Sequence, residues 1–145
     1  MIFTTSLKIR FGHVDPAGIV FYPRYFEFFN TVIEEWCEQA LGAGFNTMHT
    51  EFGYTLPMVN AECSFIKPST LGETLQAQLS LTKIGNSSIH VAIELLGDDQ
   101  LTRISAKLVL VLMDLSTRKP MPLTASLREL MQPYLKTTPE LKASQ

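Results

Sequence analysis

The carboxylate Asp15 lies between apolar flanks in the segment FGHVDPAGIVFYPRY, residues 11–25, just before a helix start. Asp-Pro followed by Ala-Gly is also a good turn sequence, because Asp bonds nearby backbone and Gly tolerates positive φ. A turn alone would not need the apolar segment that follows. Unpaired N–H groups at a helix start can hold a carbonyl oxygen as it gains negative charge. The residues therefore indicate acyl transfer, with Asp15 as base or nucleophile and backbone N–H groups between Gly18 and Tyr22 as oxyanion donors.

A long amphipathic helix is predicted over residues 23–41. Pro23 suits its first turn because an N–H there would lack an intrahelical partner, and Gly42 and Gly44 supply the stop. Its apolar positions recur at spacings of three and four residues: Phe26, Phe29, Ile33, Trp36 and Ala40.

The remaining long segments read as strands. Before the helix, Leu7, Ile9 and Phe11 alternate with basic residues, which indicates a half-buried strand. After a loop at residues 46–53, four more strands are predicted, joined by short turns, with a short helix at residues 124–135. The strand segments are residues 56–68, 73–84, 88–97 and 101–114. This order predicts an α+β fold with a mostly antiparallel sheet around one long helix, in a single domain spanning residues 1–145.

The composition narrows the class of partner. A net charge of −2 gives no electrostatic reason to expect nucleic acid or an anionic membrane. The chain is 46% hydrophobic and 18% charged, so we expect a second copy to cover part of its surface. Cys37 and Cys63 form no CxxC pair and have no metal-ligand spacing to His13, His49 or His90, which disfavours a metal site or a disulfide scaffold. With neither a leader pattern nor a long apolar run, we expect a soluble cytoplasmic protein.

The segment FGHVDPAGIVFYPRYFEFF closely resembles the signature of the 4-hydroxybenzoyl-CoA thioesterase family. MVNAECSFIKPSTLGETLQAQ resembles the family's second strand, turn and third strand. The resemblance implies a hotdog fold, in homodimers that often pair into tetramers. It also implies hydrolysis of an acyl-CoA thioester, with no cofactor beyond the CoA of the substrate. Aryl or short-to-medium acyl groups are favoured because the pocket begins among aromatic residues.

Carried over by position, the family's catalytic Asp is Asp15, and its oxyanion-hole amide is that of Tyr22, with Gly18 in the preceding turn. The implied acyl pocket takes Tyr25, Phe26, Phe29 and Asn30 from the helix, and Asn60, Glu62 and Ser64 from the neighbouring subunit's strand. Asn30 stands where the hydroxybenzoyl-specific members have an acidic residue.

The sequence offers few basic side chains at the positions where the family binds the CoA phosphates. Where the hydroxybenzoyl-specific members have several basic residues after the third strand, this chain has TKIGNSS, in which Lys83 is the one basic residue. Ser87 and Ser88 are further candidates for CoA contact. Other nucleotide contacts would come from elsewhere, such as Arg103, Lys107 or Arg118. This leaves an acyl carrier protein open as the alternative carrier.

Two other functions remain open. One is a hydratase or dehydratase on the same scaffold, although the Asp followed five positions later by His is missing, since Val20 stands there. The other is a non-catalytic acyl-CoA-binding module in which Asp15 only shapes the loop.

Overall fold

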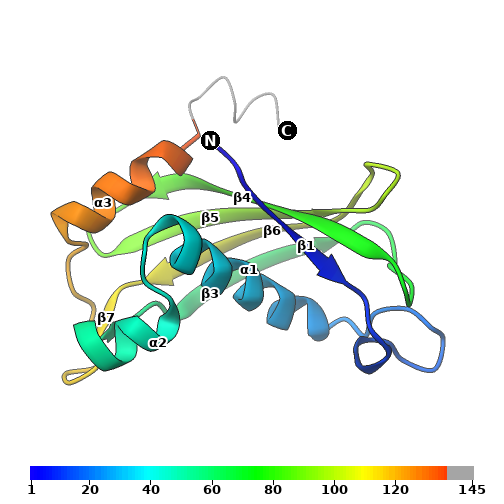
Figure 1. The fold of residues 1–145 in the computed structure, drawn as a ribbon, viewed down its shortest axis with the longest axis horizontal. Helices are drawn as coiled ribbons and strands as arrows, with labels where there is room; N and C mark the ends of the chain where they lie inside the picture. Colours follow the sequence, from blue (N-terminus) through cyan, green and yellow to red (C-terminus); the bar gives the residue numbers. More distant parts are fainter. Residues whose placement is uncertain (137–145) are drawn as a thin grey trace.

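The computed structural model describes residues 1–136 of the chain. Its main sheet is antiparallel, with the strand order β1-β4-β5-β6-β3. The strands are β1 (Phe3–Lys8), β3 (Met58–Phe65), β4 (Thr74–Ile84), β5 (Ser88–Leu96) and β6 (Thr102–Val111). Helix α1 (Arg24–Ala40) runs across one face of this sheet (Figure 1). The predicted α+β arrangement around one long helix is therefore confirmed.

The core lies between α1 and the sheet. Trp36 and Phe29 are fully buried on the helix, facing strand residues such as Leu79 and Ile93 that are equally buried. The predicted apolar stripe was wrong at Phe26, which is 38% exposed. The buried face of α1 is instead centred on Tyr25, Phe28, Phe29, Val32, Ile33, Trp36 and Cys37.

Shorter elements complete the described part. The 3-10 turn η1 (Phe11–His13) follows β1, so Phe11 is exposed and does not continue the strand as its alternation predicted. The region predicted as a loop holds two short helical turns, and the last predicted strand is cut after Val111, where β7 leaves to pair with β2. The remaining elements are α2 (Phe45–Thr47), η2 (Met48–Phe52), β2 (Tyr54–Thr55), β7 (Met113–Asp114), α3 (Ala125–Met131) and η3 (Gln132–Tyr134).

Strand β3 forms one edge of the sheet and is exposed on both of its faces. Val59 and Phe65, near the two ends of β3, are 59% and 52% exposed, which leaves apolar surface along this edge. Within residues 1–136, no helix has the length and apolar character needed to span a membrane.

Candidate active site

Asp15 sits in a tight loop closed by its own backbone. Val14 and Val20 form an antiparallel bridge, and inside it the Asp15 N–H donates to the Ile19 carbonyl at 3.0 Å. Gly18 has a φ of +79°, a conformation that glycine adopts without steric cost. One carboxylate oxygen, Oδ1, accepts the Ala17 N–H at 2.9 Å. Within residues 1–136 no hydrogen bond reaches Oδ2, so Asp15 shapes the turn through one oxygen and leaves the other without a partner there.

The loop leads directly into α1. At this junction, almost every backbone N–H between residues 20 and 26 donates to a carbonyl. The amides of Val20 and Phe21 donate to Ser69 and His13 carbonyls, at 2.9 and 3.0 Å. The amides of Arg24, Tyr25 and Phe26 each donate to the carbonyl three residues earlier, at 2.9–3.1 Å. Residue 23 is proline and has no N–H. In the part of the chain that the structure describes, Tyr22 therefore has the one amide between residues 20 and 26 with a hydrogen to donate and no acceptor.

Aromatic rings surround this junction. Phe65, at the end of β3, lies with its ring centroid 6.3 Å from Tyr22 and 5.9 Å from Tyr25. Phe28 continues the cluster and meets the edge of His13 at 4.8 Å. The Nδ1 atom of His13 accepts the Arg10 N–H at 2.9 Å, so this histidine packs and orders the turn. Our sequence reasoning missed Phe65, although the alternation of β3 placed it on the face opposite Asn60 and Ser64.

The four predicted pocket residues of α1 divide into two pairs. Phe29 is fully buried and Tyr25 nearly so, and burial raises the pKa of the Tyr25 hydroxyl above its usual value. These two residues belong to the core. Phe26 and Asn30, one turn apart on the helix, are both exposed on its open side.

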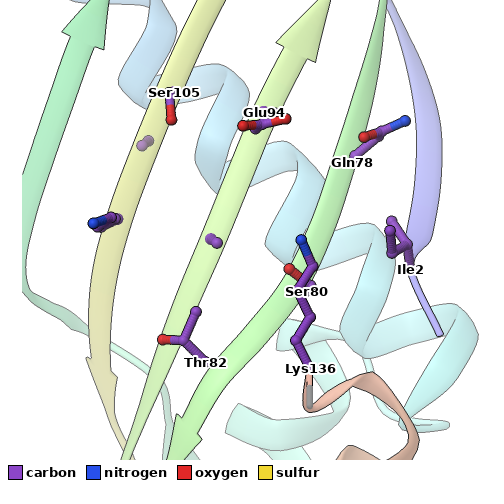
Figure 2. Close-up of a pocket in the computed structure, with 10 residues that line it drawn as sticks. Ile2, Gln78, Ser80, Thr82, Glu94, Ser105 and Lys136 are labelled. Carbon is purple, nitrogen blue, oxygen red and sulfur yellow. The ribbon is translucent and has the colours of Figure 1, made fainter. Parts of the chain in front are cut away.

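The predicted strand residues of the pocket face away from Asp15 within one chain. Asn60 pairs with Val109 and Ser64 with Ser105 across the β3–β6 ladder, and directly paired residues share a face. Ser105 lines a polar groove of about 460 Å³ on the side of the sheet opposite α1. Figure 2 shows Gln78, Glu94 and Ser105 on that face, with the helix behind the sheet. The α1 side of β3 carries Phe65 and, by alternation, Ala61 and Cys63.

The predicted CoA contacts also lie far from Asp15 in the same chain. Strand β4 begins beside the loop, where the Leu71 N–H donates to the Gly18 carbonyl. Lys83, Ser87 and Ser88 lie at its other end, about 33 Å away at roughly 3.3 Å per residue. A single chain does not bring them to the site. No group of three or more His, Cys, Asp or Glu residues within residues 1–136 is arranged to hold a metal ion.

Comparison with known proteins identifies the family of the chain. Residues 9–131 match the thioesterase-like superfamily. A 1,4-dihydroxy-2-naphthoyl-CoA hydrolase of Crocosphaera subtropica is 24% identical over 98% of this chain and 97% of its own. A 1,4-dihydroxy-2-naphthoyl-CoA thioesterase from Synechocystis superimposes with a TM-score of 0.82 at 20% identity, covering 91% of this chain and 96% of that one. A Staphylococcus aureus protein solved in complex with CoA gives a TM-score of 0.85 at 15% identity, covering 94% and 87%.

The chain belongs to the thioesterase-like superfamily, and its sheet wrapped around α1 is the hotdog fold. It is an acyl-CoA thioesterase, as the resemblance of the Asp15 segment predicted.

Proposed function

We propose that this thioesterase hydrolyses an aryl-CoA thioester carrying a ring hydroxyl, releasing the free acid and CoA. The observation that carries the proposal concerns the described residues 1–136, where the Tyr22 N–H has no acceptor and the neighbouring loop holds Asp15 with one carboxylate oxygen free of hydrogen bonds. The aromatic rings of Tyr22 and Phe65 around this point, 62% and 52% exposed, suit a flat acyl group. The full-length similarity to 1,4-dihydroxy-2-naphthoyl-CoA hydrolases supports the hydroxylated aryl class.

The chemistry needs one carboxylate and one oxyanion donor. In the general-base route, Asp15 takes a proton from water as the water oxygen attacks the thioester carbonyl, and the Tyr22 N–H stabilises the resulting oxyanion. The C–S bond then breaks, and CoA leaves as a thiolate that takes up a proton. In the nucleophilic route, a carboxylate oxygen attacks first, CoA leaves as a thiolate, and water hydrolyses the mixed anhydride. Neither route calls for a cofactor beyond the CoA of the substrate.

The proposal includes a second copy of the chain. Phe26, Asn30 and Phe65 are exposed beside the site, and β3 offers an unpaired strand edge next to them. A homodimer formed at this edge would cover these residues. A copy related by two-fold symmetry has its strands reversed, so its Lys83 end would face this chain's Asp15 end and could meet the CoA. Pairs of such dimers would make the tetramer that the family resemblance implies.

The test is thiol release from a panel of thioesters, comparing the wild type with Asp15→Asn. The panel holds 1,4-dihydroxy-2-naphthoyl-CoA, 4-hydroxybenzoyl-CoA, benzoyl-CoA, phenylacetyl-CoA and straight-chain acyl-CoAs. We expect hydroxylated aryl esters to give the highest kcat/KM, and Asp15→Asn to lower kcat by at least ~100-fold without unfolding the protein. Glu129→Gln, the same carboxylate-to-amide change at an exposed position of α3, is the matched control and should leave kcat unchanged.

The alternatives give different results in the same series. Unchanged turnover in Asp15→Asn would remove the role given to that carboxylate. Tight binding without hydrolysis of any CoA ester would favour the binding module or an acyl-carrier-protein substrate, which the same esters on a carrier protein would separate. Hydration of an enoyl-CoA, followed by absorbance, would favour the hydratase.

Asn30 provides a test of substrate class that is independent of Asp15. If its amide meets a ring hydroxyl, Asn30→Ala should lower kcat/KM about 10-fold for 4-hydroxybenzoyl-CoA, the effect of one lost hydrogen bond. The same variant should leave benzoyl-CoA hydrolysis nearly unchanged. An equal loss on both esters would mean that Asn30 does not recognise the hydroxyl.

A further inference from the structure

We infer that Arg103 is a positioning residue for the active-site loop, acting through the neighbouring segment 68–73. This inference rests on the proposed function, because it concerns the loop that carries Asp15 and leads to Tyr22. Arg103 is 5% exposed and lies at the start of β6. Its burial removes it from the candidates for nucleotide contact that the sequence suggested.

The guanidinium group joins the start of β6 to two other pieces of chain, segment 68–73 and the turn between β5 and β6. Nη1 donates to the Pro68 carbonyl at 3.1 Å and forms an ion pair with Glu73 at 3.1 Å. Nη2 pairs with Asp99 at 3.2 Å, in the turn between β5 and β6. The backbone carbonyl of Arg103 also accepts two amides, those of Ile66 and Lys67, at 2.9 and 3.2 Å. Arg103 therefore fixes both ends of segment 68–73 to the sheet.

Glu73 passes this restraint on to the middle of the segment. Its carboxylate accepts the Thr70 N–H at 2.6 Å and the Thr70 hydroxyl at 3.0 Å. Burial alone would raise the pKa of Glu73, but the Thr70 hydrogen bonds and the Arg103 charge together lower it below its usual value. The carboxylate form that these contacts need is therefore the favoured one.

Segment 68–73 in turn forms backbone contacts with the active-site loop. Thr70 and Ile19 form a bridge, the Val20 N–H donates to the Ser69 carbonyl at 2.9 Å, and the Leu71 N–H donates to the Gly18 carbonyl at 3.1 Å. These contacts hold residues 18–20, which close the loop on Asp15 and precede the Tyr22 amide. A shift of about 1 Å in such a loop can cost roughly 100-fold in rate.

The space around Arg103 fits a planar guanidinium group. A Cβ added to Gly97 would come within 2.7 Å of the guanidinium Cζ and 2.8 Å of Nε, so the absence of a side chain there is what lets the group lie in place. Lysine has one nitrogen and cannot reach Pro68, Glu73 and Asp99 together. Gly97 therefore offers a way to displace Arg103 without removing any charge.

The experiment compares Arg103→Met, Arg103→Lys and Gly97→Ala with the wild type, using two measurements. The first is hydrogen exchange of the amides in residues 18–21 and in β5, which requires no turnover. The second is kcat and KM on the best thioester, well below the unfolding temperature of every variant. The control is Leu127→Ala, which removes buried side-chain volume from α3 at a distance from the loop.

We expect Arg103→Met and Gly97→Ala to speed exchange at Val20 by at least ~10-fold while β5 keeps its protection. We expect kcat to fall about 10- to 100-fold with KM within about 3-fold, and Arg103→Lys to recover part of both effects. Leu127→Ala should lower the unfolding temperature and leave kcat and Val20 exchange unchanged. Unchanged Val20 exchange in Arg103→Met, or a loss of thermal stability with kcat intact, would overturn the inference. If the wild type hydrolysed no thioester, the proposed function would fail while the exchange data still decided whether Arg103 holds the loop.

Discussion

Tyr22 allows side-chain and backbone effects to be separated, because its ring is exposed while its N–H has no acceptor among residues 1–136. Tyr22→Phe keeps the amide and should change kcat by less than about 3-fold. Tyr22→Pro removes the amide hydrogen and should lower kcat about 100- to 1,000-fold, the usual effect of losing an oxyanion donor. Circular dichroism and thermal unfolding would verify that both variants fold. Equal activity in the two variants would place the oxyanion donor elsewhere.

Cys37 should not react with thiol reagents in the folded protein. It is fully buried on α1, and burial, with the Glu34 charge adding to it, raises the pKa of its thiol to about 12. A disulfide reagent should therefore not label Cys37 in the native protein, but should label it in denaturant. Labelling should be measured in the Cys63→Ser variant, because Cys63 is partly exposed and would otherwise react as well. Fast native labelling of Cys63→Ser would show that the α1 core opens readily.

At the same scale, residue types predicted some of the site and missed the rest. Asp15, Gly18 and Tyr22 could be singled out as candidates because the turn that they form depends on local spacing before a helix start. Phe65 was not singled out, because strand alternation defines two faces without saying which one meets the helix. Asn60 and Ser64 were assigned to the pocket of a neighbouring subunit, so that assignment stays a prediction. The partners of Arg103 lie far apart in the chain, and nothing in their spacing points to one cluster.

Among the elements, the loop that carries Asp15 depends on Gly18 for its shape. Its φ of +79° would cost a residue with a Cβ about 1–2 kcal/mol, although no heavy atom lies within 4 Å of the added carbon. Gly18→Ala should therefore lower the free energy of unfolding by about that amount in urea titrations, and Gly18→Asn by less. Gly12→Ala is the matched control, because Gly12 also has open space but no positive φ. An equal cost at both positions would contradict this account.

Segment 68–73 should make stability depend on pH. The pKa of Glu73 is below its usual value of 4.5 in the folded state, so its contribution is present above that pH and is lost as the pH falls through the folded pKa. The wild type should exceed Glu73→Gln in free energy of unfolding at pH 6–7, and this advantage should shrink on acidification. Urea titrations at several pH values measure it. A constant difference across that range would mean that the ionised form is not what stabilises the segment.

Helices and strands could be predicted where the apolar spacing repeats over enough residues to show its period. Helix α1 begins and ends within one residue of the prediction because its apolar spacing runs over four turns and is bounded by Pro23 and Gly42. The strands β2 and β7 have two residues each, too few to show alternation, and exist through their pairing with each other. The bulge between Met58 and Asn60 likewise arises from pairing with β6 and leaves no mark in the sequence.

For the whole molecule, the open edge of β3 predicts how assembly and activity are linked. Val59→Glu puts a charge on that edge, at an apolar residue that is 59% exposed, and should shift the protein towards monomer in sedimentation experiments. Its specific activity should fall with it. Leu101→Glu, the same kind of change at a residue 56% exposed in the β5–β6 turn, should leave the oligomeric state unchanged. A fully active Val59→Glu monomer would refute the proposed shared site.

The strand order also bears on how a nascent chain folds. Strand β1 pairs with β4, and α1 packs on a sheet whose centre is β4 to β6, so the first 40 residues must wait for partners made later. From the end of α1 to the end of β4 is 44 residues (84 − 40), or roughly 2–9 s at about 5–20 residues per second. Throughout that time the face of α1 that bears Phe29 and Trp36 lacks the strands β4 to β6 that cover it in the folded protein. The chain should therefore need a holding chaperone at the ribosome more than a protein whose first helix folds on its immediate neighbours.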